Sequence, residues 1–124
     1  RQDEKFSELL LGFKRMNNIV NGFRKENNAY SLKFSEGLLE EKEEKELYSF
    51  FHGKAAEIGK FISESRYIEL FQLITGAKPV IDSFFDKVLV MDKRTELRDN
   101  RLFMLENILS NFKGLIDFSR ISDK

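Results

Sequence analysis

The spacing of the apolar residues restricts the fold of this chain more than any other feature. Large apolar side chains recur at steps of three and four residues along almost the whole length, which is the period of amphipathic α-helices. One proline and seven glycines in 124 residues are too few breakers for an all-β protein. We therefore predict an all-α fold, with residues 1–124 forming a single helical bundle of about five helices.

The expected helices run over roughly residues 3–26, 39–64 and 66–75, then from Pro79 through Val88, and last from near Asp92 or Thr95 almost to Ile121. Gly76 is well suited to end the third helix, and Pro79 stands in a first turn, where proline is favoured. The faces expected to be buried are Phe6, Leu9, Leu10, Phe13, Met16, Val20 and Phe23; Leu47, Phe50, Phe51, Ile58, Phe61 and Ile62; Tyr67, Leu70, Phe71 and Ile74; Val80, Phe84, Phe85 and Val88; and Leu97, Met104, Leu105, Ile108, Phe112, Leu115 and Ile116.

Charge is balanced overall but uneven along the chain. The 21 basic and 21 acidic residues cancel, so net charge does not indicate a partner. Residues 36–46 hold six Glu against two Lys, whereas residues 87–101 hold five basic groups against three acidic ones. If the first and last helices lie side by side, this distribution predicts one acidic and one mildly basic surface. Because Arg1 stands where an initiator Met is expected, we expect a fragment of a longer protein.

Few residues suit catalysis or metal binding. The chain has no cysteine, which fits a reducing compartment, and its single histidine, His52, has no second histidine to pair with. We expect His52 to be structural or solvent-facing. No glycine-rich phosphate loop and no apolar run of membrane-spanning length occur. We therefore predict no catalytic residue, no metal site and no cofactor within these residues.

The first helix carries a polar stripe at helical spacing. Lys14, Asn18, Asn21 and Lys25 fall on one side, with Arg15 beside them. One interpretation is an ordinary solvated face. The other notes that asparagine lowers helix propensity and offers amide groups in return, which together with basic groups suit splayed RNA bases and phosphates. Composition alone leaves both interpretations open.

Three segments resemble a known family. They are FKRMNNI (13–19), LLEEKEEKELY (38–48) and, above all, the block at 79–102, in which the shared positions are Pro79-Val80, Asp82, Phe84-Phe85-Asp86, Val88, Val90-Met91 and Arg98-Asp99-Asn100-Arg101-Leu102. The chain resembles the C-terminal, DALR-like anticodon-binding domain of the β subunit of bacterial α2β2 glycyl-tRNA synthetase over roughly residues 9–121. The helical domain of arginyl-tRNA synthetase is similar in layout. This chain departs from the family pattern at Ile81, which is inserted, and at the more basic turn 92–95.

The resemblance implies a module that reads the anticodon loop of glycine tRNA and does no chemistry itself. Its implied partners are that tRNA, the rest of the β subunit and the α subunit, with no membrane and no DNA. ATP and Mg would act in the catalytic subunit, and the location would be cytoplasmic. The implied RNA-binding residues are Lys14, Arg15, Asn18, Asp86, Arg94, Arg98, Asn100 and Arg101.

Alternatives remain at this point. Arg98 and Arg101 are equally compatible with structural ion pairs to Asp82, Asp86 or Asp99. A helical protein–protein interaction module without RNA specificity would use an apolar face and would bind independently of salt. A small-molecule or metal-binding bundle would need polar residues pointing inward, whereas the expected buried faces are almost purely hydrophobic.

Overall fold

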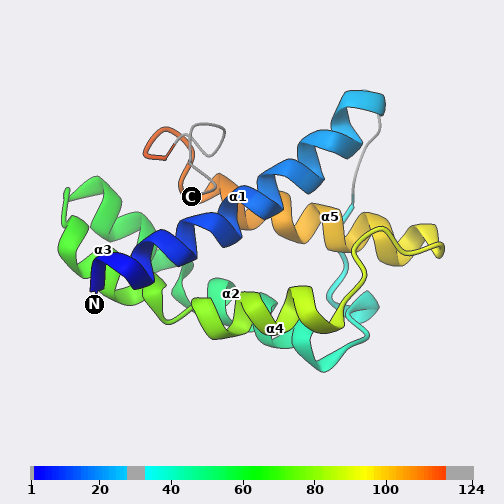
Figure 1. Ribbon diagram of the computed structural model, residues 1–124, viewed down its shortest axis with the longest axis horizontal. Coiled ribbons are helices and arrows are strands. Elements are labelled where there is room, and N and C mark those ends of the chain that lie inside the picture. Colours follow the sequence, from blue (N-terminus) through cyan, green and yellow to red (C-terminus); the bar gives the residue numbers. More distant parts are fainter. Residues whose placement is uncertain (1, 28–32, 117–124) are drawn as a thin grey trace.

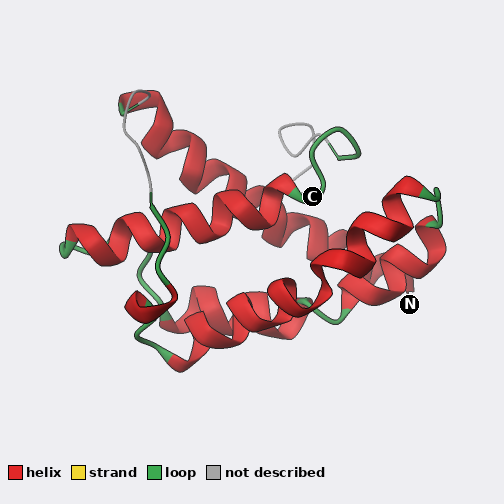
Figure 2. Cartoon of the chain, turned by 180° about the vertical axis from the view of Figure 1, so that it is seen from behind, coloured by secondary structure: helices red, strands yellow, loops and turns green. Residues whose placement is uncertain are grey.

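The computed structural model describes residues 2–27 and 33–116, which form helices joined by short connections (Figure 1). The α-helices are α1 (Gln2–Glu26), α2 (Lys42–Ser63), α3 (Tyr67–Thr75), α4 (Lys78–Lys87) and α5 (Thr95–Ser110), and a 3-10 turn, η1 (Glu36–Leu38), precedes α2. No β-strand occurs in the part of the chain so described, where Figure 2 shows helices joined by loops. The predicted all-α fold is confirmed.

The helices form two layers around the core. Helices α1 and α5 make one layer and cross each other, while α2 and α4 lie together in the other, with α3 at one end (Figure 1). Helices α1 and α5 run in opposite directions: Phe13 in the middle of α1 meets Phe112, which follows α5, whereas Arg24 near the end of α1 pairs with Glu106. The expectation that the first and last helices lie side by side is therefore confirmed.

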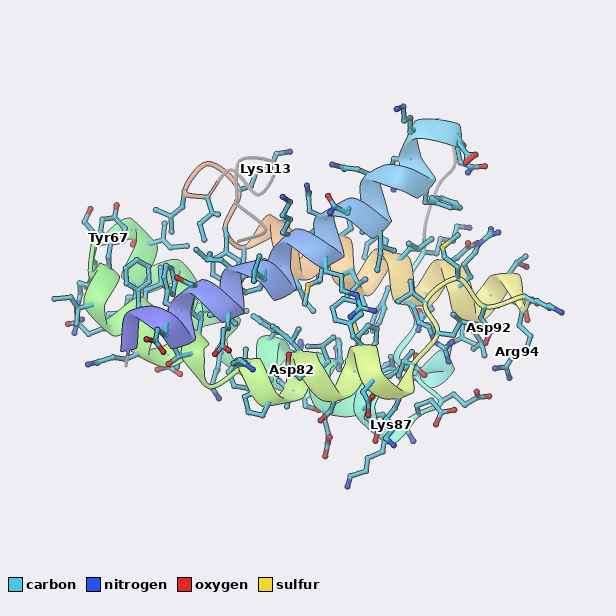
Figure 3. The ribbon with its side chains drawn as sticks, in the orientation of Figure 1. Tyr67, Asp82, Lys87, Asp92, Arg94 and Lys113 are labelled. Carbon is cyan, nitrogen blue, oxygen red and sulfur yellow. The ribbon has the colours of Figure 1, made fainter. Side chains whose placement is uncertain are left out.

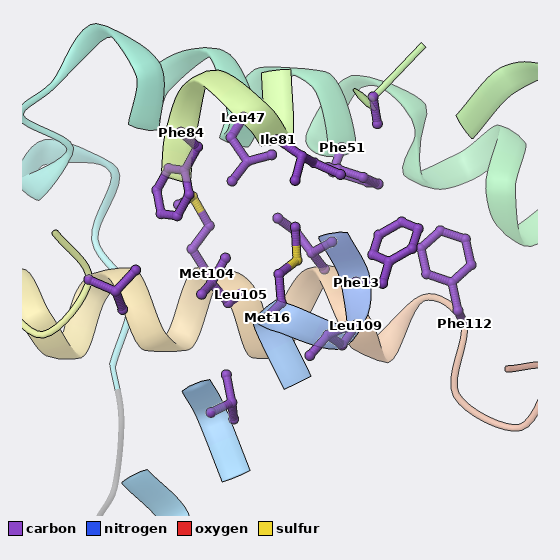
Figure 4. Close-up of a cluster of buried hydrophobic side chains, with 14 of the residues drawn as sticks. Phe13, Met16, Leu47, Phe51, Ile81, Phe84, Met104, Leu105, Leu109 and Phe112 are labelled. Atoms are coloured by element: carbon purple, nitrogen blue, oxygen red, sulfur yellow. The ribbon is translucent and has the colours of Figure 1, made fainter. Parts of the chain in front are cut away.

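The core lies between the two layers. Phe13, Met16, Leu105 and Phe112 extend from the α1–α5 side toward Phe51 and other apolar side chains of α2 and α4 (Figure 4). Almost every residue expected on a buried face is buried or half-buried; Tyr67, which remains 40% exposed on α3, is the exception. Burial of these apolar side chains is the main stabilising contribution to a bundle of this size.

Ile81, the inserted residue, belongs to this core. Its side chain is 1% exposed. A methyl group added at Gly12 of α1 would lie 3.0 Å from Ile81 Cγ2, so glycine is what allows α1 and α4 to approach closely at this point. The insertion noted in the sequence thus supplies a contact between the two layers.

The end of α5 differs from the prediction. The helix ends at Ser110, and the chain then turns through residues 111–115, where Gly114 has a φ of +90°, a conformation that favours glycine. The apolar residues Phe112, Leu115 and Ile116 still pack against the core from this turn, which explains why their spacing predicted a longer helix. Ile121 lies outside the described residues.

The segment between α4 and α5 is extended at Val88 and then turns at Val90 and Met91. Val88 and Val90 are buried, whereas Leu89 is 66% and Met91 48% exposed, so consecutive side chains alternate between core and solvent. Gly76 directly follows α3, and Pro79 lies in the first turn of α4, as predicted. None of the helices described combines the length and apolar character that crossing a membrane requires.

Two glycines of α1 provide a matched test of the α1–α4 contact. Gly22→Ala should raise the free energy of unfolding by about 0.5–1 kcal/mol, because alanine is the better helix former and no atom lies within 4 Å of the new methyl group. Gly12→Ala should gain less or lose stability, because Ile81 must move. Urea denaturation measures both, and equal gains would contradict the close approach.

Candidate nucleic-acid interface

Arg101 is one of the most deeply buried side chains in the protein. It lies on the inner side of α5 and is 2% exposed. One terminal nitrogen donates to the Leu89 carbonyl at 2.7 Å and to Asp92 Oδ2 at 3.2 Å, and the other donates to Glu44 Oε1 at 2.9 Å. The arginine therefore joins α5 to the extended segment that precedes it and to the start of α2. These partners differ from the three aspartates considered in the sequence.

Glu44 is the buried partner of this arginine and also completes the start of α2. Its carboxylate is fully buried, and the same Oε1 accepts the backbone N–H of Glu41 at 2.9 Å and that of Glu40 at 3.2 Å. A carboxylate near a helix start is favoured, because the first N–H groups have no partner inside the helix. Burial lowers the pKa of Arg101, but the hydrogen bond and charge of Glu44, with those of Asp92, outweigh it and raise that pKa.

A second ion-pair cluster lies at the surface end of this network. Arg94 donates through two nitrogens to Glu40, at 3.0 and 3.1 Å, and also donates to Asp92. These hydrogen bonds from Arg94, then its charge and that of Arg101, hold the pKa of the Asp92 carboxyl well below its usual range, and Asp92 with Glu40 raises the pKa of Arg94. The acidic segment and the basic turn thus meet through Glu40 and Arg94, while separate acidic and basic surfaces remain a prediction.

Asn100 and Arg98 precede Arg101 on α5 and have different roles. Asn100 is fully buried, and its Oδ1 accepts the backbone N–H of Ser35 at 2.6 Å, which fixes the chain entering η1 against α5. Arg98 is half-buried; it pairs with Asp99 at 2.8 Å and lies 5.0 Å from the centre of the Phe23 ring on α1. The ion pair of Arg98 with Asp99 is one that the sequence allowed.

The remaining predicted residues line α1 and α4. The Arg15 guanidinium lies 4.2 Å from the centre of the Phe85 ring, and Asp86 lines the same open hollow between α1 and α4. Asn18 is exposed further along α1. Lys14 is half-buried and interacts with another residue. Figure 3 shows Asp82 and Lys87 along α4, while Asp92 and Arg94 lie beyond the end of that helix.

The eight residues therefore divide into three environments. Asn100 and Arg101 are buried, and Arg94 and Arg98 are held in ion pairs near the start of α5. The other four lie on α1 and α4, where Arg15, Asn18 and Asp86 are exposed and Lys14 is half-buried. Sequence reasoning missed Glu44. A signal for it was present, since a glutamate at the third position of a helix often accepts the N–H of the residue before that helix. No group of three potential metal ligands occurs in residues 2–27 and 33–116.

The chain matches no family model. It is similar, however, to proteins named glycine--tRNA ligase beta subunit. It is 40% identical over 103 residues to that of Thermotoga maritima, 32% identical over 117 residues to that of Geotalea uraniireducens, and 31% identical over 122 residues to that of Persephonella marina. These matches cover 83%, 94% and 98% of this chain but only 14–16% of each relative. The chain thus corresponds to a small part of these ligase subunits.

Removing Arg101 tests the buried network. Arg101→Ala should lower the free energy of unfolding by about 3–5 kcal/mol, because it leaves the Glu44 carboxylate buried without its ionic partner. A second change, Glu44→Leu, should recover part of the loss. Lys93→Ala, an exposed change in the same turn, should have little effect on denaturant unfolding. A loss of RNA binding at unchanged stability in Arg101→Ala would contradict the structural role.

Acid titration tests the Asp92 cluster. The pKa of Asp92 is lowered on folding, so its contribution to stability is present above its ordinary pKa of 3.8 and is lost as the pH falls below that value. Thermal unfolding followed from pH 6 down to about pH 2 should therefore show a shallower loss of stability in Asp92→Asn than in the wild type. An unchanged slope would mean that other carboxylates cause the acid sensitivity.

Proposed function

We propose that this chain is the anticodon-binding part of a glycine–tRNA ligase β subunit. The observation that carries the proposal is the similarity to proteins of that name across 83–98% of the chain. In the proposed parent enzyme the α subunit activates glycine with ATP and Mg and esterifies the tRNA, and this module contributes RNA contacts but no catalytic group. The likeness in layout to the arginyl-tRNA synthetase domain remains a prediction.

The exposed residues of α1 and α4 support an RNA-binding role. Arg15 supplies a guanidinium already fixed over the Phe85 ring, Asn18 supplies an amide, and Asp86 supplies a carboxylate that is 73% exposed. Every glycine anticodon ends in two cytosines, because glycine codons begin with GG. An unpaired cytosine offers an N4 donor, which a carboxylate accepts, and O2 and N3 acceptors, to which arginine or asparagine donates.

Residues near the start of α5 take a different part in this proposal. Arg94 and Arg98 are near enough to solvent to approach phosphate, although each already has a carboxylate partner. Asn100 and Arg101 are buried, so we assign them to positioning: they fix the turn and the entry to η1 rather than contacting a base. This assignment replaces the direct base contacts that the resemblance implied for these two residues.

The second candidate function is a protein–protein interaction module. The observation that favours it is the exposure of Leu89 and Met91 side by side in one turn, with Ile68 exposed on α3. Exposed apolar groups of this kind suit contact with another protein surface, such as the rest of the β subunit. Binding through them would be insensitive to salt, unlike binding to RNA.

Anticodon recognition can be measured by fluorescence anisotropy at low, stated salt. A labelled anticodon stem-loop of glycine tRNA should bind the wild type more tightly than a copy with both cytosines changed to uracil. Affinity should fall with salt with a logarithmic slope of about −2, as for roughly three neutralised phosphates on a single strand. Arg15→Gln should weaken binding and reduce that slope by about one unit.

Matched variants outside the proposed surface control for the loss of a charge or an amide as such. Lys60→Gln removes an exposed charge from α2, and Gln72→Ala is the amide control on α3 for Asn18→Ala on α1. Asn18→Ala should weaken RNA binding without lowering the melting temperature, since alanine favours the helix. Equal binding of the cytosine and uracil RNAs would reduce the surface to a non-specific phosphate contact, and no binding would favour the interaction module.

A further inference from the structure

Four aromatic rings form a nearly parallel stack on the side of α5 that faces α2. Phe34 lies 6.3 Å from Phe103 at 24° between planes and 5.0 Å from Tyr48 at 25°. The His52 ring continues the stack, 5.0 Å beyond Tyr48 at 17°. The rings come from α5, the segment before η1 and α2, so three parts of the chain are needed to build the stack.

A hollow of about 150 Å³ adjoins these rings. Its buried floor consists of Phe51, Met104 and Ile108, and Asn107 and Asn111 line it from α5. A cavity of about this volume accommodates one benzene-sized ring. The hollow is therefore large enough for a single planar six-membered ring and too small for a helix or a strand of a partner protein.

The polar groups around the hollow have hydrogen-bonding capacity to spare. Within residues 2–27 and 33–116, the Asn107 amide has no hydrogen-bond partner, so both its donor and its acceptor are available. The Tyr48 hydroxyl lies 3.4 Å from His52 Nδ1 and 3.5 Å from Glu36, contacts at the long limit of hydrogen bonding. A ligand group with better geometry can replace either contact at little cost.

The lining distinguishes a nucleobase from other small ligands. A metal ion would need several carboxylate, imidazole or thiolate ligands, and His52 is the only such group in the lining. A purely apolar ligand would have no group to pair with the Asn107 amide that lines the hollow. A base has an apolar face for ring stacking and a polar edge for an amide, which is how single-stranded RNA is usually held.

We propose that this hollow takes up one unpaired base of the bound RNA, which extends the ring stack beyond His52 and presents its polar edge to Asn107. The small side chain of Ala55, about one helical turn from His52, leaves room for the base on this side. The proposal rests on the proposed function, because it adds a second RNA contact to the one proposed on α1 and α4. The hollow lies on a different side of α5 from the Arg24–Glu106 ion pair, which joins α5 to α1.

The test combines protein variants with RNAs that lack one base. His52→Ala, Tyr48→Leu and Asn107→Ala are compared with wild type for binding the labelled glycine tRNA anticodon stem-loop and copies carrying an abasic site at each loop position in turn. Tyr48→Phe keeps the ring, and Tyr67→Ala removes a partly exposed ring from α3, outside the hollow. Loss of a stacked base should weaken binding by about fivefold or more. Melting temperatures identify any variant that has lost its fold.

A base in the hollow gives a specific pattern. His52→Ala should weaken binding of the intact loop but not of the RNA lacking the stacked base, because each change removes the same contact. Tyr67→Ala should bind nearly as the wild type does, and Tyr48→Phe should bind more tightly than Tyr48→Leu because it keeps the ring. If the effects of His52→Ala and of the abasic site are additive at every loop position, the base-binding hollow is overturned. The proposed function still stands in that case if the wild type prefers the cytosine RNA. No binding of any RNA by the wild type would overturn the proposed function and this inference together.

Discussion

The buried ion pair between Arg101 and Glu44 joins α5 to the start of α2. The side chains of Arg101 and Glu44 are 2% and 0% exposed, so both charges lose their favourable hydration on folding. Only close pairing together with further hydrogen bonds offsets that loss. The geometry supplies both. Arg101 also binds the Leu89 carbonyl, and Glu44 also accepts the Glu41 N–H. The start of α2, the turn before α5 and α5 itself therefore form as one unit.

The identity of the residues matters as much as their charge. A guanidinium presents several donors in a fixed plane, so one side chain can reach a carbonyl and two carboxylates in different directions. A lysine ammonium would place its whole charge at one point and would leave some of these acceptors unpaired. In the described residues Arg101 Nε and Glu44 Oε2 still have no partner, so the network uses most but not all of its capacity. Each buried group left without a partner lowers the stability of the folded state.

The sequence predicted the helices better than it predicted their polar contacts. Period and breakers placed α1, α3 and the start of α4 correctly, because each helix buries one face along its own length. The same period extended α5 too far, since Phe112 and Leu115 reach the core from a turn as well as they would from a helix. Arg101 looked like a surface residue because its buried partner, Glu44, is 57 positions away in the sequence.

Under the proposed function, charge pairing also affects which surface would bind RNA at the lowest cost. A phosphate that approaches Arg94 must compete with the carboxylates of Glu40 and Asp92, which already form ion pairs with that guanidinium. Arg15, in the described part of the chain, lies on an aromatic ring and has no carboxylate within ion-pair distance. A ring contact leaves the guanidinium edge free to donate, so RNA binding there replaces water rather than an ion pair. In the proposed function, the network around Arg101 therefore fixes the fold, and recognition is assigned to α1 and α4.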